Sequence, residues 1–280
     1  MRKTTVVSLC VWMTATSASA QQRPLVTEDP ETIGSGIILI EGGLDYQRDL
    51  FYPTSGLTGN LLRAPLLGVS FGLSSIVELQ IDGGFYNRLS VTSRARAPLA
   101  NELTFTGDST TDIEDLVIAT KIRFVSEAPG RPAFGLRLAT RLPNASTESG
   151  IGLDTTDFFM SFLAGKTVES IRIVGNLGLG ILTDPTRGFR QNDVVTYGFS
   201  LARAVQEGVE IVGEVNGRWQ TREHDTPPGT ESRSVLRVGG RFTRGTVRVD
   251  GALLVGLTSR DPSIGFTAGL TWVFRGFTVP

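Results

Sequence analysis

His224 is the single histidine of this chain, and Pro227, Pro228 and Gly229 follow it closely, so we predict that it lies in a loop. A hydrolase that uses a serine and a histidine holds both on one rigid surface, with a third group that orients the histidine. A histidine in a loop of this composition is more typical of a solvent-exposed residue. We therefore predict no catalytic residue and no enzymatic activity.

Asp108, Asp112, Glu114 and Asp115 form the densest acidic cluster. Carboxylate oxygens in a loop are suitable ligands for Ca²⁺. The spacing matches no standard calcium loop, however, and a solvated acidic loop explains the cluster better. Because the chain has one histidine and Cys10 is its only cysteine, it also lacks the usual ligands of zinc. We expect no metal ion and no cofactor.

Most other charged residues recur at every second position of otherwise apolar segments. Side chains alternate between the two faces of a β-strand, so this pattern gives each strand one charged face and one apolar face. A face crowded with ions cannot form a dry core, because an unpaired buried ion costs several kcal/mol. We predict that the charged faces line a hydrated lumen, where they either contact a solute or pair with each other and fill a narrow passage. The candidates for the lumen and the solute pathway are Glu41, Asp45, Glu78, Asp82, Arg88, Lys121, Arg123, Arg137, Arg141, Arg172, Glu210, Glu214, Arg218, Arg237, Arg241, Arg248 and Asp250.

The same alternation predicts about twelve strands, and bacterial single-chain barrels have an even number. Acidic and basic strands are neighbours in this order, so we expect ion pairs between adjacent strands. The predicted strands are Ile38–Tyr46, Pro65–Leu73, Val77–Arg88, Leu116–Phe124, Phe134–Leu142, Phe158–Ala164, Ile171–Ile181, Val195–Arg203, Val209–Trp219, Leu236–Phe242, Val247–Leu257 and Ile264–Phe274.

Connection lengths favour a membrane barrel over a soluble β-sandwich. Short turns near Ser74, Glu169, Glu207 and Arg244 alternate with longer connections, as in outer-membrane barrels. The longer connections are predicted at Asp49–Asn60, Val91–Asp112, Asn144–Thr156, Pro185–Asn192, Glu223–Ser232 and Ser259–Ser263.

The apolar faces point to the same class. They carry almost no charge, with Arg203 as the exception, and they place aromatic residues near both ends of the strands. Two aromatic girdles are typical of a barrel that spans a membrane. The region of Phe51, Tyr52, Leu57 and Tyr86 could form an outer vestibule for an apolar or aromatic solute.

The N-terminus predicts delivery to the cell envelope. Residues 1–20 combine Arg2 and Lys3, a short apolar stretch and the small residues Ala18-Ser19-Ala20, which together are typical of a cleaved signal peptide. Without them the chain has 25 basic and 28 acidic residues, a net charge of about −3 that gives no reason to expect nucleic acid as a partner. We predict a signal peptide at 1–20, a periplasmic segment at 21–35 and an outer-membrane β-barrel at 36–280.

The segment Arg23-Pro24-Leu25-Val26-Thr27-Glu28-Asp29-Pro30, followed by Gly34-Ser35-Gly36, resembles the opening of outer-membrane proteins in the "meta-pathway of phenol degradation" family, which are described as transporters. The resemblance implies a barrel that passes small, often apolar or aromatic, compounds. Barrels of this kind usually end on an aromatic residue, whereas this chain ends Phe277-Thr278-Val279-Pro280.

These observations predict an all-β, up-and-down barrel that acts in passive uptake of small solutes. A plugged or structural barrel without transport, and a lipid-acting hydrolase, remain as alternatives, as does a soluble sandwich for the fold. The expected partners are the lipid bilayer, lipopolysaccharide, a small-molecule solute and the barrel-assembly machinery.

Overall fold

The structure, a computed structural model, describes residues 23–222 and 224–278. The predicted signal peptide therefore lies outside the described residues. Two short 3₁₀ helices, η1 (Ala100–Glu102) and η2 (Thr147–Ser149), lie between strands. The strands are β1 Ile37–Tyr52, β2 Leu57–Gly72, β3 Val77–Gly84, β4 Asn87–Arg94, β5 Ser109–Asp112, β6 Val117–Val125, β7 Ala133–Arg141, β8 Asp157–Val168, β9 Ile171–Thr183, β10 Gln191–Gln206, β11 Val209–Gln220, β12 Arg233–Arg244, β13 Val247–Gly256 and β14 Ile264–Arg275.

All strands of the described chain belong to one antiparallel sheet that closes on itself through the pairing of β1 with both β14 and β2. β3 and β4 follow one another along the same edge of β2, and β5 and β6 follow one another beside them. The fourteen strands therefore occupy twelve positions around the barrel, each here called a stave, with β3 and β4 in one stave and β5 and β6 in the next. This confirms the predicted all-β up-and-down barrel. Closure pairs both edges of the long strands, as a bilayer requires, whereas the short β5 pairs with β4 alone.

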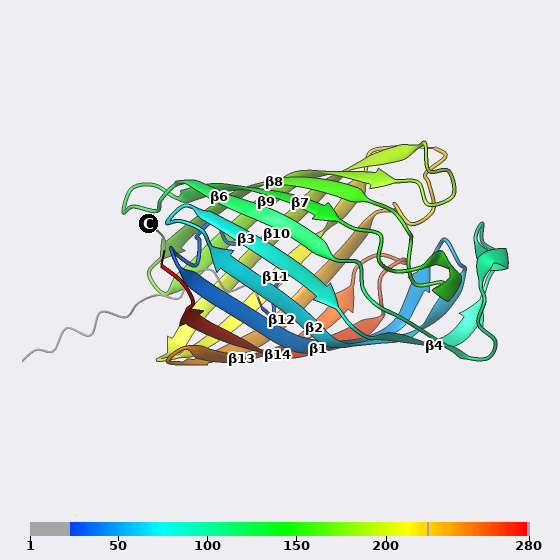
Figure 1. The fold of residues 1–280 in the computed structure, drawn as a ribbon. Coiled ribbons are helices and arrows are strands. Elements are labelled where there is room, and N and C mark those ends of the chain that lie inside the picture. Colours follow the sequence, from blue (N-terminus) through cyan, green and yellow to red (C-terminus); the bar gives the residue numbers. More distant parts are fainter. Residues whose placement is uncertain (1–22, 223, 279–280) are drawn as a thin grey trace, which may run out of the picture.

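The two ends of the barrel differ in the length of their connections (Figure 1). One end, here called the short-turn end, has tight turns such as Glu169-Ser170 and Glu207-Gly208, and the last strand ends there. The other, the loop end, has the long connection between β4 and β5. The connection predicted at Asp49–Asn60 is wrong, because β1 and β2 extend to Tyr52 and from Leu57. Their backbones keep pairing well beyond the apolar part of these strands.

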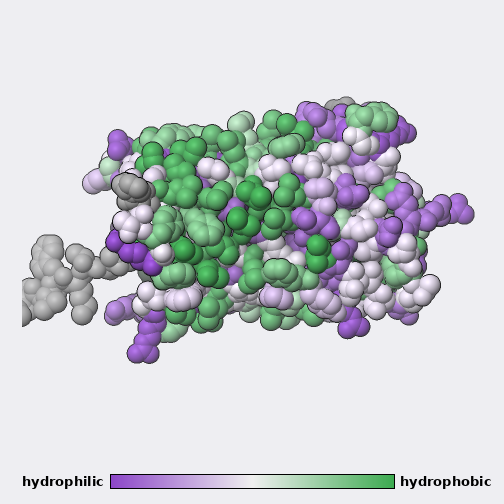
Figure 2. All heavy atoms as spheres, in the orientation of Figure 1, coloured by the Kyte–Doolittle hydropathy of each residue, from purple (hydrophilic) through white to green (hydrophobic). Residues whose placement is uncertain are grey.

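The outer surface carries a belt of exposed apolar side chains, among them Leu177, Phe199, Leu253 and Leu270. On the face that it draws, Figure 2 shows apolar side chains gathered over the middle of the barrel and toward the short-turn end, with polar residues at the loop end. No helix in residues 23–222 and 224–278 is long and apolar enough to cross a membrane. A closed barrel with an apolar exterior and a charged interior fits a bilayer as its surroundings.

Aromatic residues pair near both limits of this belt. Tyr46 of β1 contacts Phe266 of β14, with ring centroids 5.7 Å apart. Near the short-turn end, Trp272 contacts Phe274 at 4.3 Å. Arg203, the predicted exception on the apolar face, is exposed near the short-turn end of β10. At that position its long side chain can reach the polar interface.

The alternation of faces reverses part of the way along three neighbouring staves. In β3, Glu78 and Gln80 are buried inside, whereas in β4 the buried residues are Asn87 and Leu89. The prediction that Arg88 lines the lumen is therefore wrong: it is exposed, on the face opposite to Leu89. A shift of one residue moves every following side chain to the other face of a strand. The pairing of β1 with β2 shows a register shift at the same level, between Gly43 and Asp45.

We predict that Leu177→Arg lowers the stability of the barrel in lipid vesicles by about 2–4 kcal/mol, the cost of a cation near the middle of the bilayer. Leu177 lies at the centre of β9 with 62% of its surface exposed. Phe189→Arg is the control, because Phe189 is 90% exposed in the connection between β9 and β10. Urea titration of folding into vesicles measures both, and equal losses would contradict a lipid-facing belt.

Candidate functional site

Several of the charged side chains predicted to line the lumen pair with one another on the inner wall. Within the lumen, adjacent strands are joined by ion pairs, as the order of acidic and basic strands predicts. Lys121 Nζ lies 3.4 Å from Glu78 Oε1, and Arg237 Nη1 lies 2.8 Å from Glu214 Oε1. Each of these pairs joins residues that are direct partners in the strand register. The prediction of cross-strand ion pairs is thus confirmed.

The chain before β1 also lies in the lumen. Residues Arg23–Ile33, here called the lumenal segment, contact the inner wall on β3, β6, β7, β9, β11, β13 and β14. We expected a periplasmic segment over 21–35, and the described part instead runs through the barrel interior. The physical reason is charge and backbone pairing: wall side chains bind both its acids and its peptide N–H groups.

Glu28 forms the centre of these contacts. Its carboxylate lies 3.3 Å from Lys121 Nζ and 3.0 Å from Arg137 Nε. Lys121 is fully buried, so its positive charge depends on the carboxylates of Glu28 and Glu78 for neutralisation. Removing one partner of a buried ion pair is strongly destabilising, because the other charge stays buried. This cluster therefore fixes the lumenal segment to β3, β6 and β7.

Wall side chains also satisfy the backbone of the lumenal segment. The Glu214 carboxylate accepts hydrogen bonds from the N–H groups of Val26 (2.9 Å) and Thr27 (2.8 Å). Asn176 accepts from the Glu28 N–H at 2.7 Å and donates to the Glu28 carbonyl at 2.8 Å. A segment without a neighbouring strand needs such partners for its backbone inside a protein. The interior wall thus holds a specific backbone conformation.

The first residue of the lumenal segment is anchored on the far side of the barrel. Arg23 donates from Nη2 to Thr267 Oγ1 at 3.0 Å and to the Ala268 carbonyl at 2.8 Å, and its Nε lies 3.5 Å from Asp250. Gly43 and Gly269 make room for it, because a Cβ at either position would collide with the guanidinium group.

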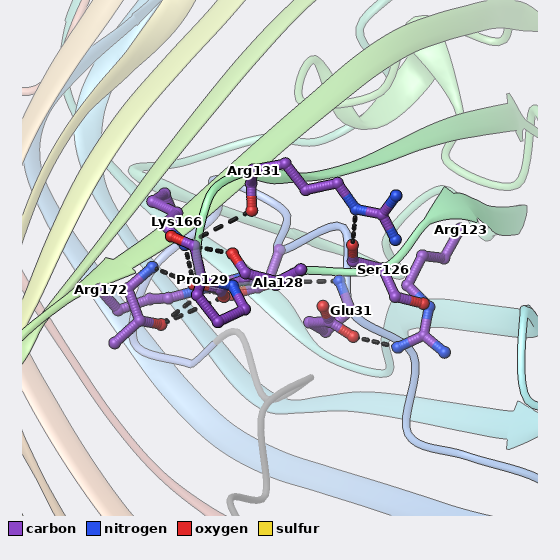
Figure 3. A network of polar contacts seen from close by, with 11 residues as sticks. Glu31, Arg123, Ser126, Ala128, Pro129, Arg131, Lys166 and Arg172 are labelled. Carbon is purple, nitrogen blue, oxygen red and sulfur yellow. Dashed lines mark hydrogen bonds and ion pairs between the residues drawn. The ribbon is translucent and has the colours of Figure 1, made fainter.

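Toward the short-turn end, the segment joins a second polar network (Figure 3). Arg172 donates to both carboxylate oxygens of Asp29, at 2.6 and 2.8 Å, and to Glu127 at 2.5 Å. Arg123 pairs with Glu31. Bidentate arginine–carboxylate pairs have a fixed geometry, so they position as well as attract.

Glu127, in the turn between β6 and β7, completes this network. Partial burial raises the pKa of Glu127, but hydrogen bonds from the Thr167 N–H and from Lys166, with the charge of Arg172, outweigh burial and leave the pKa below its usual value. Glu127 therefore stays ionised at neutral pH and keeps its ion pair with Arg172.

Open space in the lumen lies beyond the segment, toward the loop end. A cavity of about 360 Å³, here called the vestibule, is lined by strand residues and by loop residues such as Thr54, Leu153 and Gly229. A second cavity of about 250 Å³ shares Arg63, Glu114, Asp115 and Val117 with it and is bordered by Arg23 and Val26 of the segment. The lumen is thus hollow at the loop end, whereas the lumenal segment fills it toward the short-turn end.

The vestibule only partly matches the one predicted from sequence. Tyr52 lines it, and Leu57 is fully buried in the apolar cluster beside it. Tyr86 instead is exposed at the level where the faces reverse. A larger hollow of about 550 Å³ is formed by apolar residues such as Ile118, Leu138 and Met160, which belong to the lipid-facing belt.

The other sequence candidates do not assemble into a reactive site. His224 is exposed, and in the described residues it has no serine as a hydrogen-bond partner. Asp112 and Asp115 accept hydrogen bonds from N–H groups of the connection between β7 and β8, and Glu114 pairs with Arg63. In residues 23–222 and 224–278, no group of three or more His, Cys, Asp or Glu side chains is arranged to hold a metal ion.

Comparisons with known proteins agree with this architecture. No family model matches the chain, and no similar curated protein was found. An outer membrane channel from Pseudomonas putida F1 has a similar structure, with a TM-score of 0.59 at 15% identity, covering 88% of this chain and 98% of that one. The chain thus has the fold of outer-membrane β-barrels. The translocator domain of autotransporter NalP from Neisseria meningitidis is also similar, with a TM-score of 0.50 at 13% identity and coverages of 86% and 89%. At these identities the likeness shows the fold, so the more specific resemblance to the phenol-degradation family stays a prediction.

Sequence reasoning missed the acids of the lumenal segment and Arg63. One signal was available: the predicted lumen residues comprise ten bases and seven acids, and the segment carries three acids, Glu28, Asp29 and Glu31. Each of the three pairs with a basic wall residue. Arg63 precedes the strand predicted to start at Pro65, so the longer β2 was needed to find it.

We predict that Lys121→Met lowers the free energy of unfolding by about 3–5 kcal/mol, because Glu28 and Glu78 then lose their shared buried cation. Lys166→Met is the matched control, since Lys166 is partly exposed and bonds mainly to turn carbonyls, and it should lower stability by only about 1 kcal/mol. Urea unfolding followed by tryptophan fluorescence compares them. Similar losses of stability in the two variants would contradict a particular contribution of the buried Glu28 cluster to the free energy of unfolding.

Proposed function

We propose that this outer-membrane barrel is a channel for passive uptake of small solutes, aromatic or apolar ones among them. The observation that carries the proposal is the pair of adjacent cavities in the loop-end half of the lumen, which stop at the lumenal segment. A twelve-stranded barrel is wider than the small barrels filled by their own side chains and narrower than open porins. A solute pathway through it is therefore narrow and set by side chains.

In this proposal the lumenal segment is the barrier of the channel. It is held mainly by ion pairs and side-chain hydrogen bonds rather than by β-sheet pairing with the wall. Such contacts can exchange for water one at a time when the segment moves. The wall charges Arg137, Arg141, Arg237 and Arg241 then line the passage for the solute.

The segment equally motivates a second candidate, a barrel that stays plugged and serves a structural role. Its contacts are many, and the Glu28 cluster is buried. The two candidates differ in one property, because only a channel conducts when the segment moves.

We expect single-channel recordings of the refolded protein in a planar bilayer to show small conductance steps that phenol reduces, because an aromatic solute occupies the vestibule. Recordings in the same salt solution without phenol serve as the control for the solute effect. A protein that inserts without any step, with or without phenol, would contradict an open channel and favour the plugged barrel.

The triple variant Glu28→Gln, Asp29→Asn and Glu31→Gln should raise the mean conductance several-fold, because it removes the carboxylates that bind the segment to the wall and leaves the wall unchanged. The matched control is Glu102→Gln, Glu169→Gln and Glu207→Gln, which removes three exposed carboxylates outside the lumen. If the segment variant conducts no more than the control, the segment is not the barrier.

The proposed function also implies partners. The apolar belt requires the lipid bilayer. Lipopolysaccharide and the barrel-assembly machinery follow from the location of the protein and stay predictions, as does the solute.

A further inference from the structure

The vestibule has an unequal distribution of charge. Four arginines line it, Arg63, Arg141, Arg218 and Arg233. Arg63 pairs with Asp45 and, at 2.8 Å, with Glu114. Arg141 pairs with Asp157 and lies 3.7 Å from Asp115. Each of these two guanidinium groups therefore has two carboxylates as partners.

Arg218 and Arg233 have no such partners among the described residues. Arg218 donates to the carbonyls of Glu231 (2.9 Å) and Gly229 (2.6 Å), and Arg233 donates to the carbonyl of Phe51 (3.0 Å). Carbonyls satisfy N–H groups without neutralising the charge. Both residues are half-buried, so water screens their charges only in part.

The two arginines also lie side by side on neighbouring strands. Arg218 of β11 is the direct register partner of Arg233 of β12. Like charges opposite each other on neighbouring strands are destabilising. An anion that binds between them would relieve this repulsion and use the N–H groups that carbonyls leave free. A carboxylate is suited to this because it accepts paired N–H donors from guanidinium groups.

Apart from the arginines, the vestibule has an apolar part and a polar part, the latter formed by Gln47, Thr54, Asn87, Glu114 and Asp115. Leu50, Tyr52 and Leu61 of β1 and β2, with Ile151 and Leu153 of the connection between β7 and β8, line it beside the arginines. Leu50 and Leu61 are held in place by the buried cluster with Leu57 and Leu89. At about 360 Å³, the cavity has the size of pockets that hold small organic molecules.

Building on the channel role proposed above, we propose that the vestibule binds small organic acids, with the carboxylate between Arg218 and Arg233 and an apolar or aromatic body against Leu50, Tyr52 and Leu61. The solute class is thereby narrowed from apolar compounds to apolar carboxylates. An uncharged analogue loses the ion pairs, and an inorganic anion loses the apolar contacts.

Isothermal titration calorimetry of the full barrel in an uncharged detergent tests this site without any need for conduction. The probes are benzoate, benzyl alcohol and inorganic phosphate. Benzoate should bind with a single site, and the other two at least tenfold more weakly. Arg218→Gln and Arg233→Gln should each weaken benzoate binding about tenfold, the effect of losing a charge-assisted hydrogen bond.

Arg48→Gln is the matched control, because Arg48 is exposed on β1 and its ion-pair partner among the described residues is Asp49. Arg233→Lys keeps the charge and should retain part of the affinity, and heat-dependent gel mobility verifies that each variant is folded. Benzoate binding that both glutamine variants leave unchanged would overturn the proposal. So would benzyl alcohol that binds as well as benzoate, which indicates an apolar site, or phosphate that does, which indicates a general anion site. A channel that conducts without binding benzoate would refute this site alone, whereas benzoate binding without conduction would refute the channel alone.

Discussion

Backbone pairing is the constraint on which this structure depends. Inside a bilayer each peptide N–H and C=O needs a partner within the protein, so a chain made of strands must close its sheet. The junction of β1 with β14 meets that need, and it makes the first and last strands neighbours. The alternation of side chains then gives an apolar exterior and a charged interior, because each strand can present only one face to lipid.

Closure of the barrel encloses more basic than acidic side chains of the wall, and the lumenal segment balances part of this charge. A ring of strands this size encloses many charged side chains, and the wall bases outnumber its acids among the residues predicted from sequence. Glu28, Asp29 and Glu31 supply carboxylates from the chain that precedes the barrel. The segment is thus part of the electrostatic balance of the interior. Any motion of it exposes wall charges to water or to a solute.

The strands were predictable because each obeys a local rule, alternation along its own sequence. Arg88 was misplaced because the reversal of faces arises between staves, at a register shift that involves β1 and β2, and no property of the segment Val77–Arg88 alone reveals it. Strand ends were also hidden: beyond the apolar belt, β1 and β2 continue with residues whose composition is typical of loops. The path of residues 23–33 could not be predicted, since it depends on partners more than a hundred residues away.

The reversal of faces divides the staves of β1, β2 and β3–β4 into a lower and an upper part with opposite solvent preferences. Below it, apolar side chains point outward and ions point inward. Above it, Leu57, Leu61 and Leu89 point inward and form a dry core, while Arg88 and Thr58 lie on the other face. The upper part of these three staves is therefore built like the sheet of a water-soluble β-protein, with an apolar cluster inside and polar side chains outside. On this side of the barrel the mouth can therefore extend beyond the bilayer into water without exposing its apolar cluster.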